Sequence, residues 1–219
     1  MKIVHVPCYS TADPIPVLEE NMEVLESYAF IGIVGTAQHL NMLDQLKACL
    51  EARGKKASVG GQILGCRQEN ALKLDVDCFI YVGSGRFHPL GIALKTEKPV
   101  FILNPISGVL DRITDAEKRR WIGKRKGAIA RALESKTFGI MVSTKDGQFD
   151  LKRAFVLKRR LEAKGKKACI FAAEELSPNN LIPFKVDCWV NTACPRIEGD
   201  EYNRPVVNAA ELEALLACL

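Results

Sequence analysis

The sequence predicts an α/β fold made of two duplicated βαβ-type domains with parallel sheets, preceded by an N-terminal remnant strand and helix. Apolar β-like runs alternate with helical segments, which is typical of parallel sheets joined by right-handed crossovers. The second half also repeats the first. LEARGKKA at 50–57 returns as LEAKGKKA at 161–168, and VDCF at 76–79 returns as VDCW at 186–189. Self-similarity over half a chain indicates a duplicated module.

Residues 2–8 read as a short buried strand, and a helical segment follows around 17–25. We interpret residues 1–27 as the remnant of a preceding domain. The middle domain, 28–110, begins with a strand at 29–35. A helix from about 41 comes next, because Leu43, Leu46 and Leu50 share one face and Gly54 supplies a C-terminal stop.

The remaining elements of this domain alternate in the same way. We expect a strand near 56–59, a short helix, a strand at 77–82, a helix ending near 94 and a strand at 99–103. The C-terminal domain, 111–219, starts with a long helix over 114–134 whose Thr114 and Glu117 form a capping box. The last helix begins at Asn208, with Glu211 as its capping partner.

The overall composition is that of an ordinary globular protein. The chain has 219 residues, of which 47% are hydrophobic and 26% charged. It has no apolar run of the roughly 18 residues that span a bilayer and no apolar core of a signal peptide at the N-terminus. We therefore expect a cytoplasmic protein without a membrane partner. The net charge of +5 indicates an acidic partner only weakly.

Eight cysteines in a chain without an export signal argue against a disulfide framework. The absence of any C-x-x-C pair argues against a zinc finger or ribbon. Some cysteines sit in apolar runs or helices, where a thiol usually serves as a small hydrophobe. We interpret these as structural: Cys49, Cys78, Cys169, Cys188 and Cys218. Cys8, at the end of the expected first strand, also fits a core position.

Three loop sequences follow or join β-like runs: GGQILGC at 60–66, GSGRFHP at 83–89 and NTACPR at 191–196. Loops at strand ends of α/β proteins converge and carry ligands. In the first, three glycines within six residues let the chain bend tightly before a thiol. Cys66 and Cys194 each lie close to an arginine, which favours the thiolate and hence metal binding.

The duplication relates the second loop to the third. Alignment of the two VDC segments places Ser84 opposite Cys194 and Arg86 opposite Arg196. The GSGRFHP loop can be a turn with a helix cap. Alternatively, its glycine amides at a helix N-terminus attract a carboxylate with which Arg86 pairs bidentately. His88 fits either a capping role or a substrate contact.

Together, GGQILGC, VGSGRFHPLGIAL at 82–94 and NTACPRI at 191–197 resemble the archaeal form of the diphthamide-synthesis enzymes, the 2-(3-amino-3-carboxypropyl)histidine synthases. The resemblance spans nearly the whole chain. The family has three related domains, and this chain looks like the last two. The resemblance implies a non-classical radical enzyme that uses a 4Fe-4S cluster to cleave S-adenosylmethionine. The 3-amino-3-carboxypropyl group is then transferred to carbon 2 of a histidine of elongation factor 2, the first step of diphthamide formation.

The resemblance also implies the site residues. In the family three thiolates, one from each domain, hold the cluster. Cys66 would be the ligand of the middle domain and Cys194 that of the last. The third ligand would be Cys8, a cysteine of a second chain, or one in a segment outside this sequence. No catalytic side chain is implied beyond the cluster ligands. The S-adenosylmethionine site would be lined by Gln62, Gly83, Ser84, Gly85, Arg86, His88 and Arg196.

The implied partners are elongation factor 2 as protein substrate, an electron donor and a second copy of the chain in a homodimer. Two other classes stay open. A non-catalytic subunit could support or dimerise with a complete partner. The other is a basic α/β protein that binds RNA, because residues 118–126 carry a run of lysine and arginine. Without an aromatic platform or an RNA-binding motif, we expect no direct nucleic-acid contact and interpret the run as a solvated helix face.

Overall fold

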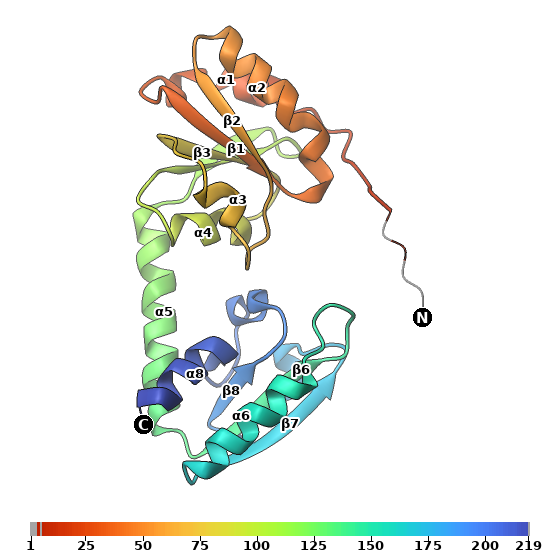
Figure 1. Ribbon diagram of the computed structural model, residues 1–219, viewed down its shortest axis with the longest axis vertical. Helices are drawn as coiled ribbons and strands as arrows, with labels where there is room; N and C mark the ends of the chain where they lie inside the picture. The colour runs from red at the N-terminus through yellow and green to blue at the C-terminus, as the bar shows by residue number, and fades with distance from the viewer. Residues whose placement is uncertain (1–3, 5, 219) are drawn as a thin grey trace. The chain divides into compact units, whose positions relative to one another are not determined.

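A computed structural model describes residue 4 and residues 6–218 of the chain. Residue contacts divide it into two compact units, Met1–Lys118 and Arg119–Leu219. The boundary falls inside the 20-residue helix α5 (Asp115–Glu134), which begins in the first unit and continues in the second. Each unit is an α/β layer structure, as the sequence predicts (Figure 1).

The first unit contains a five-stranded sheet in the order β2-β1-β3-β4-β5. Its first four strands are parallel, and β5 pairs antiparallel with β4. The antiparallel edge strand was not expected from the sequence, since its four residues are largely exposed and show no apolar run. The strands are β1 (Phe30–Gly35), β2 (Lys56–Gln62), β3 (Cys78–Val82), β4 (Val100–Asn104) and β5 (Val109–Arg112).

Helices cover both faces of this sheet, with α1 and α2 on one face and α3 and α4 on the other (Figure 1). On α2 the three leucines at 43, 46 and 50 are buried, and Gly54 ends the helix region with a φ of +76°. Both predictions are confirmed. The helical segments are α1 (Ile15–Glu20), η1 (Met22–Leu25), η2 (Ala37–Met42), α2 (Leu43–Ala52), α3 (Glu69–Leu72) and α4 (Phe87–Ala93).

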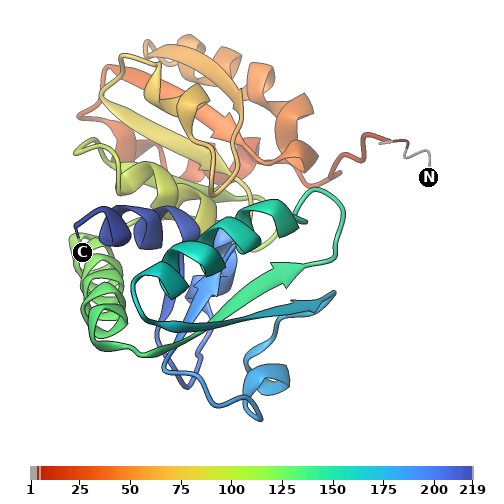
Figure 2. The same ribbon diagram turned by 60° about the horizontal axis from the view of Figure 1, so that its bottom comes forward.

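The second unit has a wholly parallel four-stranded sheet in the order β7-β6-β8-β9. Helices α6 and α8 lie together on one face of it (Figure 2). Their buried side chains join those of β6 and β8 in one core cluster. The elements are β6 (Thr137–Ser143), α6 (Leu151–Ala163), β7 (Lys167–Ala173), α7 (Pro178–Leu181), β8 (Cys188–Asn191), η3 (Pro195–Gly199), β9 (Val206–Asn208) and α8 (Ala209–Cys218).

The duplication extends to packing across the sheet. Gly32 on β1 is opposite Phe79 on β3, and Gly139 on β6 is opposite Trp189 on β8. A β-carbon added at Gly139 would lie 2.2 Å from the ring of Trp189, and one at Gly32 would lie 2.9 Å from that of Phe79. In both units a glycine therefore makes room for a buried aromatic ring on the neighbouring strand.

Both predicted helix caps are present. The Thr114 hydroxyl accepts from the Glu117 amide at 3.2 Å, and the Glu117 carboxylate accepts from the Thr114 amide at 2.9 Å. At the last helix, the Glu211 carboxylate accepts from the Asn208 amide at 2.8 Å. These contacts satisfy backbone donors that the first helical turn leaves unpaired.

The predicted N-terminal strand is wrong at the positions the structure describes. Residue 4 and residues 6–8 are not in a strand, and Val4 and Val6 are 78% and 79% exposed. Neither sheet offers them a partner strand, so their apolar side chains have nothing to pack against. Residues 2, 3 and 5 of the prediction lie outside the described residues.

Candidate functional site

The first glycine motif is shared between a strand and a turn. Residues Gly60–Gln62 belong to β2 rather than to a loop, which corrects the sequence interpretation. The pairing of β1 with β2 shifts register there, because Val59 and Gly61 face consecutive residues of β1 and Gly60 is left as a bulge. An added β-carbon at Gly60 would lie 2.9 Å from the Asn70 carbonyl oxygen, and Gly61 has a φ of +79°. The glycine pair therefore bends β2 directly before the Cys66 turn.

Cys66 lies exposed in a tight turn beyond β2. The Leu64 amide donates to the Arg67 carbonyl at 2.9 Å, and the Arg67 amide donates back to Leu64 at 3.0 Å. The backbone of Gln62 is held by the Asn70 side-chain amide, which donates to its carbonyl at 2.8 Å. The thiol is thus presented to solvent from a hydrogen-bonded turn.

The second motif begins directly after β3. Gly83 and Gly85 have φ angles of +149° and +78°, a region that favours glycine. The Tyr81 hydroxyl donates to the Ser84 carbonyl at 3.3 Å. Burial raises the pKa of Tyr81 to about 12, so the phenol stays protonated and can donate at neutral pH. The exposed loop is therefore supported from inside the unit.

Arg86 is occupied by oxygens of its own unit. Its guanidinium pairs bidentately with Glu117, contacts Asp111 and donates to the Arg112 carbonyl at 2.7 Å. The hydrogen bonds from Arg86 hold the pKa of Glu117 at about 2, well below its usual value. Arg86 thereby ties the glycine loop to β5 and to the first turn of α5.

Two predicted cofactor residues of the first unit line one pocket. Gln62 and His88 both border a cavity of about 790 Å³ at the carboxyl ends of β1 and β2. The His88 ring stacks on Tyr81 with 6.0 Å between ring centroids. Cys8 lines the same cavity and is exposed, so its expected core position is wrong. The carboxyl edge of a parallel sheet is where α/β proteins bind ligands.

The third motif begins at Asn191, the last residue of β8, and runs into η3 of the second unit. The buried Asn191 side chain accepts from the Ala193 amide at 2.9 Å and donates to the Cys194 carbonyl at 3.0 Å. Cys194 is partly exposed and lines a pocket of about 310 Å³ together with Arg196. Ser143 and Ser177 also border it, so this pocket, too, lies at the carboxyl edge of a parallel sheet.

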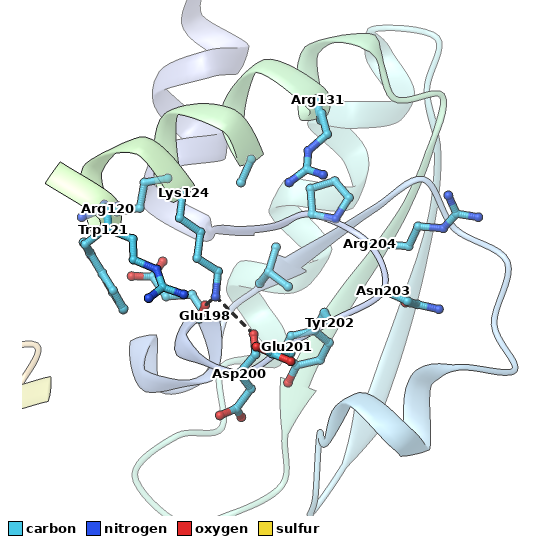
Figure 3. Close-up of a pocket in the computed structure, with 14 residues that line it drawn as sticks. Arg120, Trp121, Lys124, Arg131, Glu198, Asp200, Glu201, Tyr202, Asn203 and Arg204 are labelled. Atoms are coloured by element: carbon cyan, nitrogen blue, oxygen red, sulfur yellow. Dashed lines mark hydrogen bonds between the residues drawn. The ribbon is translucent and has the colours of Figure 1, made fainter. Parts of the chain in front are cut away.

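Helix α5 anchors the segment that follows Cys194. The Lys124 ammonium donates to the carbonyls of Glu198 and Asp200 at 2.9 and 3.3 Å (Figure 3). It also donates to the carbonyl of Gly199 at 3.4 Å. Arg125 pairs with Glu211 at 2.5 Å. Lys124 and Arg125 border a cavity of about 280 Å³, together with Trp121, Glu198 and Tyr202. The basic run is therefore partly structural and not only a solvated helix face.

The cysteines separate into buried and accessible ones. Cys78 and Cys188 are buried, as predicted, and burial raises the pKa of each thiol to about 12. Cys169 is exposed on the edge strand β7, so the structural interpretation is wrong for it. Accessible thiols in strand-end turns are suitable iron-sulfur ligands, and Cys66 and Cys194 fit that description. Within the described part of either unit, no three Cys, His, Asp or Glu side chains group closely enough to hold a metal ion.

Sequence reasoning missed several residues that shape these sites, namely Gln68, Tyr81, Phe87 and Asn191. A polar residue that ends an apolar strand, as Asn191 does, was a usable signal. Gln68 offered no such signal, because in the sequence it looks like any polar loop residue. In the structure it is only 1% exposed.

Residues 1–218 match the diphthamide synthesis protein family. The chain is 33% identical over 226 aligned residues to the 2-(3-amino-3-carboxypropyl)histidine synthase of Pyrococcus horikoshii, covering 97% of this chain and 65% of that protein. With the enzyme of the same name from Methanocaldococcus jannaschii it shares 39% identity over 160 residues, covering 70% and 46%.

A solved structure is also similar. The crystal structure of Dph2 from Pyrococcus horikoshii with a 4Fe-4S cluster superposes with a TM-score of 0.82 at 32% identity, over 96% of this chain and 64% of that one. The chain therefore spans less than two-thirds of the length of these relatives.

Proposed function

Because this chain belongs to the diphthamide synthesis protein family, we propose that it takes part in the first step of diphthamide formation. In that step a 3-amino-3-carboxypropyl group passes from S-adenosylmethionine to a histidine of elongation factor 2. The observation that carries the proposal is the carboxyl edge of the first unit. There, Gln62 and His88 border one cavity, and Cys66 lies exposed in the turn that follows β2.

Cys66 and Cys194 would hold a 4Fe-4S cluster, whose chemistry when bound is one-electron reduction. Both thiols are accessible, and each lies in a turn at the end of a strand of a parallel sheet. The turns are held by backbone and side-chain hydrogen bonds, so the backbone that carries each thiol is fixed before any ligand binds. This preorganisation is what an iron ligand needs.

The S-adenosylmethionine site would be formed at the same edges. The amides of Ser84 and Gly85 would bind the carboxylate, since the positive φ angles of Gly83 and Gly85 open this backbone to a ligand. Gly83 would line the site through its α-carbon, because its own amide donates to the Leu103 carbonyl at 3.0 Å. Gln62 and His88 would line the cavity, and Arg196 would line the pocket of the second unit. Arg86 would support the carboxylate site, either by direct contact or through the loop that it fixes.

The proposed partners are those of the full-length family members: elongation factor 2, an electron donor and a second copy of this chain. The proposed location is the cytoplasm. No helix among the described residues has the length and apolar character that crossing a membrane requires.

The test is the amount of iron and acid-labile sulfide per chain after anaerobic reconstitution. We expect about four irons per cluster, lost in Cys66→Ser and in Cys194→Ser but retained in Cys169→Ser. The last variant is the matched control, because Cys169 is an exposed thiol outside the strand-end turns. Loss in Cys8→Ser as well would identify the third ligand. A folded wild type with little iron would contradict the proposal that this chain holds a cluster.

A second candidate is a subunit that shares its cluster with another chain. Within the described residues of either unit no three-ligand group is present, so a thiolate from a second chain would complete the ligand set. One cluster for every two chains, accompanied by a dimer on reconstitution, would support this arrangement.

A further inference from the structure

The turn that carries Cys66 is covered by a side chain from the other glycine motif. A β-carbon added at Gly65 would lie 1.9 Å from Cε1 and 2.3 Å from Cδ1 of Phe87. The aromatic ring therefore lies directly on the α-carbon of Gly65, and only glycine leaves room for it. Phe87 is the first residue of α4 and belongs to the GSGRFHP motif.

Helix α4 contacts the turn at a second point one helical turn later. A β-carbon added at Gly91 would lie 3.0 Å from the Gly65 carbonyl oxygen and 2.5 Å from the Gln68 side-chain nitrogen. Residues four apart lie on the same helix face, so Phe87 and Gly91 together present one face of α4 to the turn.

Gln68 holds the turn from the buried side. It is 1% exposed, and its Nε2 donates to the Leu64 carbonyl at 3.2 Å and to the Gly65 carbonyl. Both accepting carbonyls belong to the turn that contains Cys66. The thiol is thus exposed while the backbone on either side of it is fixed.

Phe87 is partly exposed, and it lies outside the core cluster that α1 and α2 form with the sheet. Its contact with Gly65 joins residues that are 22 positions apart, and their two motifs are those on which the proposed iron and cofactor sites rest.

We propose that Phe87 and Gln68 are positioning residues for Cys66, fixing the direction in which its thiolate is presented to iron. The inference rests on the proposed function for the identity of the ligand. The packing itself is independent of it. Functional groups need supporting side chains that lock their geometry to fractions of an ångström, and this turn has such support from two sides.

The experiment is a double-mutant cycle on the full chain without iron, using Gly65→Ala and Phe87→Ala. Hydrogen exchange of the Leu64 and Arg67 amides reports the turn, and the alkylation rate of Cys66 relative to Cys169 reports the thiol. We expect each single variant to speed exchange of the two amides about tenfold. In the double variant the added methyl group fills the space that the ring leaves, so exchange is slower than in either single variant.

Two further variants separate positioning from simple loss of stability. Phe87→Leu keeps an apolar side chain over Gly65 and should recover most of the protection and the wild-type alkylation ratio. Gln68→Met keeps the volume but loses both hydrogen bonds, and should speed exchange of the turn. Gln45→Met, the same change on an exposed site of α2, is its control and should leave the turn unchanged.

The proposal is overturned if Phe87→Ala leaves the turn amides and the Cys66 alkylation ratio as in the wild type. It is equally overturned if the effects of Gly65→Ala and Phe87→Ala simply add, because then the ring does not act through Gly65. Neither result depends on whether the chain binds iron, so this proposal and the proposed function can fail separately.

Discussion

The carboxylates of Asp77 and Asp187 make the same contact in the two units. Each accepts hydrogen bonds from two successive backbone amides where the first strand of its sheet begins. Asp77 lies 2.9 and 2.8 Å from the amides of residues 29 and 30, and Asp187 lies 3.0 and 2.8 Å from those of residues 136 and 137. The duplication therefore preserved a charge-assisted link that sets the register of the first and third strands.

Replacement of Asp187 tests this link. Hydrogen bonds from the hydroxyl and amide of Thr137 lower the pKa of Asp187 in the folded chain. The stabilisation is therefore complete above the ordinary aspartate pKa and is lost as the pH falls through the lowered folded value. We expect Asp187→Asn to lower the free energy of unfolding by about 1 kcal/mol at pH 7. Urea unfolding at several pH values should show the difference vanishing in acid, while Asp146→Asn, at an exposed site, has no effect.

The ion pair between Arg86 and Glu117 predicts a second pH dependence. The pKa of Glu117 is about 2 because of its hydrogen bonds with Arg86. Its contribution is fully present above the ordinary glutamate pKa and disappears as the pH falls toward 2. Glu117→Gln should cost about 1 kcal/mol at neutral pH, since the pair is partly exposed and screened.

The direct measurement for this pair is an NMR titration of the Glu117 carboxyl group. In Arg86→Met the pKa should return toward the ordinary value. The control is Glu97→Gln, which should leave the Glu117 pKa unchanged. It removes a carboxylate from an ion pair with Lys118 at 3.4 Å, but the Glu97 side chain is fully exposed. An ordinary Glu117 pKa in the wild type would contradict the contact.

Gly139→Ala tests the packing of Trp189. The new methyl group would lie 2.2 Å from a ring that is completely buried. Neither ring nor strand can move without cost, so we expect a loss of about 3 kcal/mol or more. Gly123→Ala in α5 is the matched control, since nothing lies within 4 Å of the added carbon. It should stabilise the helix by about 0.5–1 kcal/mol, and thermal unfolding would show the two opposite shifts.

Gln62→Leu tests the proposed cofactor cavity. Because the Gln62 side chain borders that cavity, loss of its amide should weaken S-adenosylmethionine binding by up to about tenfold, or 1.4 kcal/mol. Isothermal titration calorimetry on the reconstituted chain measures it. Gln45→Leu, on the exposed face of α2, is the control. Equal affinity of both variants for S-adenosylmethionine would show that Gln62 does not contribute to the site.

Lys124→Met tests the anchoring of the segment after Cys194. Methionine cannot donate to the three carbonyls that the Lys124 ammonium binds, so hydrogen exchange of residues 198–201 should become several-fold faster. The control is Lys126→Met, which removes the same charge from the same helix. The Lys126 side chain is not a donor to these carbonyls. Protection that survives in Lys124→Met would show that η3 is held by its own hydrogen bonds.

The α/β class, the duplication, both helix caps and most strands follow from the sequence alone. Each of these depends on local patterns, such as apolar runs, the Thr114–Glu117 spacing and a repeated segment, which tertiary packing reinforces. The three loop motifs with glycines or a cysteine were also recognisable. Backbone conformations with a positive φ favour glycine, and the glycines are visible in the sequence.

How those motifs are held depends on the tertiary structure. Sequence spacing could not show that Phe87 covers Gly65, that Gln68 is buried beneath the Cys66 turn, or that Arg86 is bound by Glu117 and Asp111. The same holds for Cys8 and Cys169, whose exposure depends on which strands exist and which lie at an edge. Burial and side-chain partners are set by long-range pairing and packing, which a local sequence pattern does not encode.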